Sequence, residues 1–589
     1  MAKPFYTPVR RNHIVGPAGV GSILLTRSGV TALMCGLPVW LDKAPARGSE
    51  EAEKRTDRVN LLRSLELHDS AAEATLRVSR FINPPVIDDS PRHGVSWLLP
   101  AIRFPLAEYC RNSQCQRLGF ASSESPSVTK CPDCEGKHWN RRQQVPIVRI
   151  CPAGHLDEVD FFGLVHGDNP CSDQVRLQYR MGDNVTSPEI TCLDCGVKRR
   201  VDSKESGPCS GARPWLPNSA PDICDKQMTI SDRSSTSVYF PDVRSYLHIP
   251  AVGGLRDTVL RWLEQDQSAH PLLEVAGDAG LDPLLKLARP YFPDLTTESL
   301  RAHVLHLREP APLGENSAEE LKALTSEERS QPTSDGPPAL DVQTIPAKLF
   351  QQLRIGPGKP ISRVVAVHRL AETRALVGFS RVTPPSRADA DERGFELLWG
   401  QPQGSKAEQD WLPGMRVYGE GILLELDPIR VSDWARQSRL HIDPVTLNGA
   451  PLPVEFQLAH TLAHLFMNAA ATQCGYPIAS LHDRIYHVDG RTALLVYTGG
   501  GDVMGTMGGL VELAQPGLLE PLLETAIANG RWCGLDPVCL NPVQHIRADV
   551  AGACHQCCFL PETSCGSWNT GLDRATLIGR GDLVGYLDL

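Results

Sequence analysis

The chain has 589 residues, of which 41% are hydrophobic and 22% charged, with a formal net charge of -10 at pH 7. These values are typical of a globular protein with several domains. The negative charge excludes binding to nucleic acid through the overall field and leaves only a local basic patch for that role. Neither an apolar signal-peptide core nor a run of about 18 apolar residues is found, which predicts a soluble, cytoplasmic chain without a membrane span.

The predicted elements change in character along the chain. Short apolar runs between turns come first, followed by a loop-rich stretch with many cysteines. Helical periodicity then marks 254–265, 282–292 and 296–307, and short β-like runs follow at 361–370, 375–385 and 415–427. A helix over 454–475, a strand over 492–500 and a helix over 518–533 end the series.

These patterns predict a multidomain chain of mixed α+β and α/β class. The cysteine-rich block resembles a zinc ribbon, and the last domain is expected to be a layered α/β domain with a four-cysteine zinc site. The predicted segments are a β-rich domain (1–105), the cysteine-rich block (106–250), a helical segment with a linker (251–345), a β-rich middle domain (346–450) and the α/β C-terminal domain (451–589).

The cysteines are spaced like metal ligands. Sixteen of the eighteen lie within 110–224 and 533–565, and three C-x2-C pairs stand among them. This spacing lets a tight turn present two thiolates to one tetrahedral ion, and the reducing cytoplasm favours zinc over disulfides. Four thiolates leave no open coordination position, so we expect two or three structural Zn2+ ions. The predicted quartets are Cys110, Cys115, Cys131 and Cys134; Cys192, Cys195, Cys209 and Cys224; and Cys539, Cys554, Cys557 and Cys565.

Further candidate ligands lie close to these quartets. Cys151, His155, His166 and Cys171 stand between the first two, where they either form a mixed site or replace a ligand of the second. Cys533 competes for the fourth position of the third quartet. The remaining cysteines, Cys35, Cys474 and Cys558, are expected to be small buried hydrophobic residues.

Two histidines, His460 and His464, are one helical turn apart and therefore share a helix face, an arrangement that suits a metal ion. Thr461 stands where a zincin metalloprotease has its glutamate, which excludes that class. Asp502 and His482 are possible third ligands. The favoured interpretation is a buried pair that forms hydrogen bonds with the neighbouring layer, because two ligands alone do not define a site.

Two further motifs bear on nucleotides and nucleic acids. The run GPAGVGS, Gly16 to Ser22, has the spacing of a phosphate-binding loop but lacks its lysine, so ATP binding is excluded there. Basic residues next to the cysteine pairs form either a phosphate-binding patch or a solvated surface. These residues are Arg141, Arg142, Lys198, Arg199 and Arg200.

The C-terminal strings HTLAHLFMNAA and ACHQCCFLPETSCGSWNTGLDRATL resemble the domain of unknown function attached to the C-terminus of certain DNA helicases. Those helicases share a Cys-x2-Cys-x7-Cys element followed by N-x3-LD, and their cysteines bind zinc. The matching residues here are Cys554, Cys557, Cys565, Asn569, Leu572 and Asp573.

Earlier segments, among them CPAGHLDEVDF, SSTSVYFPDV, LAETRALVGFSRVTPP and YGEGILLELD, are similar to the DrmB family of the DISARM anti-phage systems. This resemblance implies a defence protein without its own motor that works with the helicase DrmA in a DNA-binding complex. It supplies no catalytic residues. We therefore predict a non-enzymatic subunit with structural zinc, and the alternative is a metal-dependent hydrolase or nuclease that uses His460 and His464.

Overall fold

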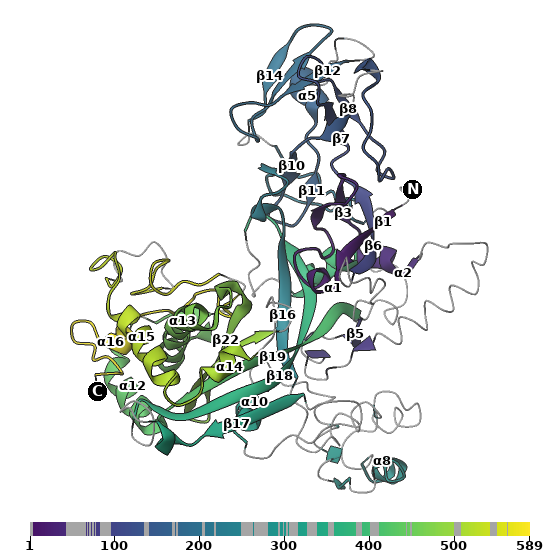
Figure 1. Cartoon of the computed structure of the whole chain (residues 1–589). Helices are drawn as coiled ribbons and strands as arrows, with labels where there is room; N and C mark the ends of the chain where they lie inside the picture. Colours follow the sequence, from purple (N-terminus) through teal and green to yellow (C-terminus); the bar gives the residue numbers. More distant parts are fainter. Residues whose placement is uncertain are drawn as a thin grey trace. The chain divides into compact units, whose positions relative to one another are not determined.

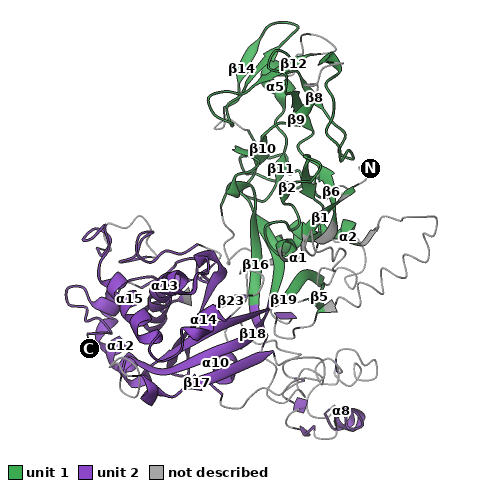
Figure 2. Cartoon of the chain, viewed as in Figure 1, with its two compact units in different colours: residues 1–68, 78–245, 374–415 green, residues 69–77, 246–373, 416–589 purple. Residues whose placement is uncertain are grey.

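The chain divides into two units, each with apolar cores of its own, in the computed structural model (Figure 1, Figure 2). Unit 1 comprises residues 1–68, 78–245 and 374–415, and unit 2 comprises residues 69–77, 246–373 and 416–589. The structure describes residues 4–42, 66–67, 69, 72–73, 76, 78–82, 96–134, 141–167, 171, 175–202, 207–216, 219–248, 263, 281–292, 295–297, 300–301, 304, 316–326, 339–350, 359–383, 391–400, 411–442, 444–447, 450–499, 508–541, 550–561 and 564–588.

Four small antiparallel sheets of three or four strands lie wholly within the described residues of unit 1. Sheets of this size bury little apolar surface, so loops and short helices make up much of the unit. In strand order, the sheets are β1 (Phe5–Arg10), β6 (Ser96–Arg103), β3 (Thr31–Met34) and β2 (Ile23–Leu25); β8 (Leu118–Phe120), β7 (Ala107–Cys110) and β9 (Arg142–Gln144); β11 (Leu156–Asp157), β10 (Ile147–Ile150) and β15 (Thr229–Asp232); and β12 (Leu177–Arg180), β13 (Glu189–Cys192) and β14 (Lys198–Arg200).

Short helices and strands complete unit 1. They are α1 (Arg11–Ile14), α2 (Leu37–Asp42), α5 (Phe161–His166), α11 (Asp391–Trp399), the 3-10 turns η1 (Pro132–Cys134) and η2 (Thr236–Val238), and the strands β4 (Glu66–Leu67) and β5 (Arg80–Ile82). Three long strands contribute residues to both units: β16 (Phe240–His248), β18 (Ile361–Ser380) and β19 (Trp411–Leu426). The runs predicted separately at 361–370 and 375–385 thus begin and end one strand, β18, of 20 residues.

The glycine-rich run at Gly16 to Ser22 is a packing feature. A Cβ added to Gly19 would lie 2.5 Å from Leu376, and one added to Gly21 would lie 2.5 Å from the ring of Phe379. Gly21 also has a φ of 78°, in the left-handed region that side chains rarely adopt. Close approach of β18 therefore explains these glycines.

Arg381 joins three backbone segments inside unit 1. Its fully buried guanidinium donates hydrogen bonds to the carbonyls of Gly154, Val238 and Gly21. Burial lowers the pKa of Arg381 to about 9. Gly154 lies in the CPAGH loop, so this arginine supports a loop that carries two candidate ligands, Cys151 and His155.

Unit 2 is organised around a sheet in which β17, β18, β19, β23 and β22 are neighbours in that order. The pairs β19–β23 and β23–β22 are antiparallel, with Leu423 opposite Leu495 and Ile485 opposite Leu494. The other strands and helices are β17 (Leu340–Ile345), β20 (Thr446–Leu447), β21 (Ala450–Pro451), β22 (Leu481–Val488), β23 (Arg491–Gly499), α8 (Leu281–Ala288), α10 (Asn316–Leu324), α12 (Pro428–Ser438), α13 (Val454–Cys474), α14 (Gly509–Glu512), α15 (Leu519–Arg531), α16 (Ala575–Ile578) and the turns η4 (Ala347–Leu349) and η7 (Ile478–Ser480).

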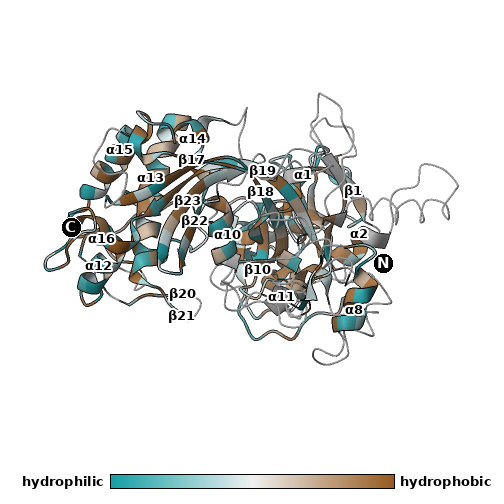
Figure 3. Cartoon of the chain, turned by 90° about the horizontal axis from the view of Figure 1, so that it is seen from below, coloured by the Kyte–Doolittle hydropathy of each residue, from teal (hydrophilic) through white to brown (hydrophobic). Residues whose placement is uncertain are grey.

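Alternate residues of the central strands pack on opposite faces of this sheet, as the two-residue period of a strand requires. Ile422 and Leu424 belong to the large core beneath α13 and α15, whereas Leu423 packs with Leu321 and Leu324 of α10. The sheet of unit 2 is therefore buried on both faces. Figure 3, coloured by hydropathy, shows α13 beside the strands β22 and β23.

Helix α13 holds the histidine pair and is buried on nearly all sides. An apolar, alanine-rich sequence suits such a core helix. The helix ends at Cys474, and the next residue, Gly475, has a φ of 73° and provides the left-handed cap. This helix agrees with the one predicted over 454–475.

The mixed α/β class predicted from the sequence is confirmed, and the five-segment division stays a prediction. The helix predicted at 282–292 corresponds to α8, whereas most of the one predicted at 254–265 lies outside the described residues. Within the described part of the chain, no helix has both the length and the apolar character needed to cross a membrane.

Candidate metal centres

Five groups of four potential metal ligands are found among the described residues, and in each group the ligand atoms lie within 4.8 Å of one another. All eighteen cysteines are free of disulfide bonds. The groups are the ribbon group (Cys110, Cys115, Cys131, Cys134), the Cys151 group (Cys151, His155, Cys209, Cys224), the His166 group (His166, Cys171, Cys192, Cys195), the C-terminal group (Cys533, Cys539, Cys554, Cys557) and the histidine group (His460, His464, Asp483, Cys565).

The sulfur–sulfur distances fit a shared ion. In the ribbon group, Cys110 Sγ lies 3.8 Å from Cys134 Sγ, and Cys115 Sγ lies 3.8 Å from Cys131 Sγ. A disulfide needs about 2.0 Å between sulfurs. Tetrahedral zinc with bonds of about 2.3 Å to sulfur separates its thiolates by about 3.8 Å. The donor set and its spacing are thus compatible with zinc.

The ribbon group contains the four residues of the first predicted quartet. Cys110 ends β7 and Cys115 follows in the next turn, while Cys131 precedes η1 and Cys134 is its last residue. These cysteines form a small cluster of their own, separate from the apolar core of the surrounding sheets. Burial raises the pKa of the Cys110 thiol to about 12, so an ion bound there would displace a proton.

The second predicted quartet is divided between two groups in the structure. Cys209 and Cys224 lie with Cys151 and His155, whereas Cys192 and Cys195 lie with His166 and Cys171. The reason is topological: Cys192 ends β13 in one three-stranded sheet, while Cys151 follows β10 in another. Sequence distance alone could not separate the two pairs.

The Cys151 group has a supporting shell around its histidine. His155 Nδ1 lies 3.3 Å from Cys209 Sγ, and its other ring nitrogen, Nε2, lies 3.0 Å from Asp222 Oδ2. Arg213 in turn pairs with Asp222 at 2.7 Å. A carboxylate on the far nitrogen is the usual way in which proteins orient a metal-binding histidine.

The His166 group lies nearer the surface, with Cys171 and Cys195 exposed. Cys171 Sγ is 3.6 Å from both Cys192 Sγ and His166 Nε2. Burial opposes ionisation of Cys192, but the backbone N–H groups of Cys195 and Asp194 lower its pKa to about 6. His166, the last residue of α5, is the ligand that completes this group.

Backbone N–H groups point at one or more sulfurs in each of four groups. Each donor lies two residues after its cysteine, which is the geometry of a turn folded around a thiolate. A donated hydrogen bond favours the charged form that binds metal. These contacts are Ala153 to Cys151 (3.3 Å), Asp194 to Cys192 (3.4 Å), Gly211 to Cys209 (3.3 Å), Gln556 to Cys554 (3.4 Å) and Ser567 to Cys565 (3.4 Å).

The C-terminal group takes Cys533 as its fourth member in place of Cys565. Cys533 Sγ lies 3.5 Å from Cys554 Sγ, and Cys539 Sγ lies 3.8 Å from Cys557 Sγ. Asp536 accepts a hydrogen bond from the Cys533 amide. Cys533, which the sequence left as a competing fourth ligand, therefore lies with Cys539, Cys554 and Cys557.

Arg574 supports the C-terminal group through Asp536, which also accepts the hydrogen bond from Cys533. Its buried guanidinium pairs with Asp536 at 2.6 Å and donates to the carbonyls of Gly552 and Gly530. Burial disfavours the charge, but the hydrogen bond with Asp536 raises the pKa of Arg574. The neighbouring motif residues are also structural: Asn569 forms two hydrogen bonds with the backbone of Leu560.

The histidine group brings the two histidines of α13 together with Asp483 of β22 and with Cys565. Each of these four residues is buried. Asp483 could not be predicted as a ligand from spacing, because the sequence does not show which strand residue faces the preceding helix. Of the third ligands considered, Asp502 lies outside the described residues, and the ring of His482 packs 5.5 Å from that of Tyr497.

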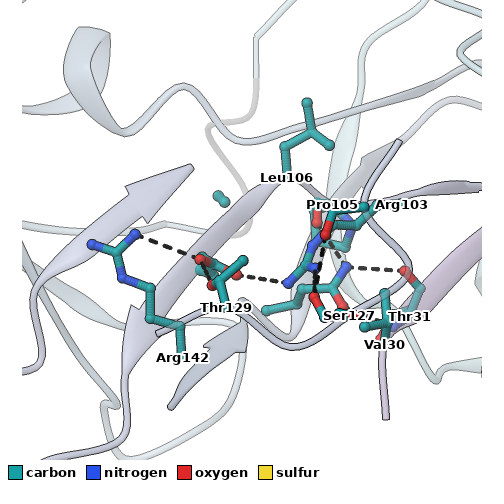
Figure 4. Close-up of polar contacts among 12 residues, drawn as sticks. Val30, Thr31, Arg103, Pro105, Leu106, Ser127, Thr129 and Arg142 are labelled. Carbon is teal, nitrogen blue, oxygen red and sulfur yellow. Dashed lines mark hydrogen bonds and ion pairs between the residues drawn. The ribbon is translucent and has the colours of Figure 1, made fainter. Parts of the chain in front are cut away.

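The basic residues considered for nucleic acid divide into two sets. Arg142 is nearly buried and pairs with the buried Glu108 at 3.5 Å, within the polar network shown in Figure 4. Arg141 is exposed beside it. The other three, Lys198, Arg199 and Arg200, form the exposed strand β14, where Lys198 lies 3.9 Å from Glu189.

Comparisons with known proteins show what the chain resembles. Residues 10–240 match a family model described as Domain of unknown function (DUF8724), a span that includes the ribbon, Cys151 and His166 groups. The chain is also 28% identical over 527 residues to the DISARM protein DrmB of Bacillus paralicheniformis, which covers 82% of this chain and 89% of that relative. The resemblance drawn from the sequence is confirmed by this likeness along most of both chains: the chain is a homologue of DISARM protein DrmB.

Proposed function

We propose that the chain is a non-motor subunit of a DISARM anti-phage complex that binds the helicase DrmA and helps it engage foreign DNA. The observation that carries the proposal is the similarity to DrmB over 82% of the chain. The glycine-rich run at Gly16 to Ser22 supports the proposal too. Its residues Gly19 and Gly21 are packed against β18, and the run lacks the lysine that nucleotide binding requires.

The metal groups have a structural role in this proposal. Each cysteine-rich group offers four ligands, which complete a tetrahedral set and leave no position for substrate. The described sheets that lie wholly within unit 1 have three or four strands each, and bound Zn2+ would add stability to the turns between them that carry the ligands. The ions therefore hold the loops that present the binding surfaces.

The exposed strand β14 is the favoured DNA contact. Lys198 and Arg200 keep more than half of their side chains exposed, and Arg199 lies between them. Such residues bind phosphates without reading sequence, and each contact that is formed releases counterions. Arg142 is not part of this surface, since its side chain is only 12% exposed and is paired with the buried Glu108.

The test uses the full chain, the helicase DrmA and duplex DNA over a range of salt concentrations. We expect the complex to bind DNA more tightly than the helicase alone. Replacing Lys198, Arg199 and Arg200 with alanine should lower both affinity and the salt slope, by up to about three phosphate contacts. The control is Arg436→Ala, an exposed arginine on α12 paired with Asp433. If the complex bound DNA no better than the helicase and left its ATPase unchanged, the proposal would be wrong.

A hydrolase centred on His460 and His464 is the weaker candidate. Both side chains are fully buried, and a phosphodiester must reach the metal for hydrolysis to occur. The histidine group also contains four ligands, as closed sites do. If His460→Ala abolished a nuclease activity of a complex that stayed folded, this candidate would be restored.

A further inference from the structure

The histidine group supports an inference separate from the four cysteine-rich groups. We propose that His460, His464, Asp483 and Cys565 together bind one Zn2+ ion in a closed, fully buried site of unit 2. The four residues come from α13, β22 and the C-terminal segment, so the ion would join that segment to two elements that lie well before it in the sequence.

The ligand atoms have the spacing of a tetrahedral site. Asp483 Oδ2 lies 3.2 Å from His460 Nε2 and 3.3 Å from His464 Nε2, and His460 Nε2 lies 3.1 Å from Cys565 Sγ. Tetrahedral zinc with bonds of about 2.0–2.1 Å to nitrogen and oxygen separates such atoms by about 3.3–3.4 Å. The two imidazole rings are nearly perpendicular, at 86°, so both can turn one nitrogen inward.

Surrounding backbone groups orient the ligands. His464 Nδ1 lies 2.8 Å from the carbonyl of Cys558 and donates its proton there. Asp483 Oδ1 accepts the amide of Gly566 at 3.0 Å, which leaves Oδ2 to face the histidines. Cys565 Sγ accepts amides from Ser567 and Asn569 at 3.4 and 3.3 Å. His464 and Asp483 thus each have one polar atom held by the backbone, and the other atom of each faces the centre of the group.

Without an ion this arrangement is unfavourable. A neutral His464 that donates from Nδ1 has a bare lone pair on Nε2, which forms no hydrogen bond although it is buried. That lone pair faces Asp483 Oδ2 at 3.3 Å, so two acceptors confront each other. A cation between the two acceptors removes the conflict.

The donor set favours zinc among the common metals. Two imidazoles, one carboxylate and one thiolate match a borderline-soft ion that accepts four mixed ligands. Calcium and magnesium prefer sites made of oxygen atoms alone. With four protein ligands and no exposed side chain, the site is structural, and it fixes the C-terminal segment against α13 and β22.

The experiment measures zinc per chain by mass spectrometry on the purified full-length protein and its variants. Cys565→Ala should lose one Zn2+ per chain, and the ligand exchange Cys565→His should retain it in part or in full. The matched control is Cys474→Ala, which removes a cysteine at the end of α13 that lies outside the five groups. Unchanged zinc in Cys565→Ala would show a metal-free, hydrogen-bonded cluster and overturn the proposal.

A second measurement needs no variant and so remains decisive if Cys565→Ala fails to fold. Anomalous scattering from wild-type crystals, recorded above and below the zinc absorption edge, should place a peak among the four ligand atoms. A map with peaks at the cysteine-rich groups but none at the histidine group would refute the site. A peak that appears at the edge of another metal would refute the assignment to zinc.

Discussion

Asp222 shows how one carboxylate controls a site without binding the ion itself. It lies 3.0 Å from His155 Nε2, fixing which ring nitrogen faces Cys209, and Arg213 holds it in place. Loss of such a partner typically weakens metal binding by 10–100-fold. The residue is not a ligand, so its effect acts through the orientation of His155.

We therefore expect Asp222→Asn to release zinc from the Cys151 group at about 10–100-fold lower chelator concentration than the wild type. The measurement is competition with a coloured chelator, followed by counting the zinc lost per chain. Asp225→Asn is the matched control, because Asp225 is 87% exposed and pairs only with its neighbour Lys226 among the contacts described. Equal zinc retention in both variants would contradict the role of Asp222.

At the same scale, the sequence identified most of the candidate ligands that lie together in the structure, but it did not predict how they are grouped. Spacing was sufficient for the ribbon group, whose four cysteines lie close together along the chain. It failed for Cys209 and Cys224, because the strands between them and Cys151 determine which turns meet. Asp483 could not be predicted, since a carboxylate on a strand becomes a candidate only when the helix packed on that strand is known.

Among the elements, α10 is held to the sheet by one buried carboxylate. Glu320 forms a two-pronged pair with Arg484 of β22, at 2.7 and 2.6 Å, and accepts a third hydrogen bond from Tyr486. Burial raises the pKa of Glu320, although the contact with Arg484 opposes this. The apolar contribution of α10 comes from few residues, chiefly Leu321 and Leu324.

Glu320→Gln keeps the shape of the side chain but removes its charge. We expect the free energy needed for local opening of α10 to fall by about 1.5–3 kcal/mol, the usual value of hydrogen bonds to a charged group. Amides of residues 316–324 should then exchange their hydrogens at least about tenfold faster. Glu512→Gln, at an exposed carboxylate on α14, serves as the control. Unchanged exchange in α10 would show that packing alone holds the helix.

The long helices of unit 2 could be predicted from the sequence, because a long, regular helix shows a clear repeat of apolar residues. The predicted helices at 454–475 and 518–533 correspond to α13 and α15. Strand β18 was harder to predict, because the polar residues Glu372, Thr373 and Arg374 interrupt its apolar run. Glu372 is nevertheless buried and accepts a hydrogen bond from Tyr497, so a tertiary partner permits the strand to continue.

Across the whole molecule, the two units differ in what stabilises them. Unit 2 has extensive apolar cores on both faces of its sheet. Around the ribbon group of unit 1, by contrast, the buried cluster consists of cysteines, and around the Cys151 group it adds only Ala153 and Met228. Metal ions should therefore contribute a larger share of stability in unit 1 than in the sheet of unit 2.

Removal of metal from the full chain should expose this difference. With a strong chelator in excess, amides of β7, β9 and β13 should lose hydrogen-exchange protection first, because these strands adjoin turns that carry the ligands. Amides of β19 and β23 should remain protected, since their hydrogen bonds lie within an apolar core that needs no ion. Added zinc should restore the lost protection. Simultaneous loss in both sets would mean that the ions stabilise the chain as one cooperative body, and retention in both would mean that the cysteine turns fold without metal.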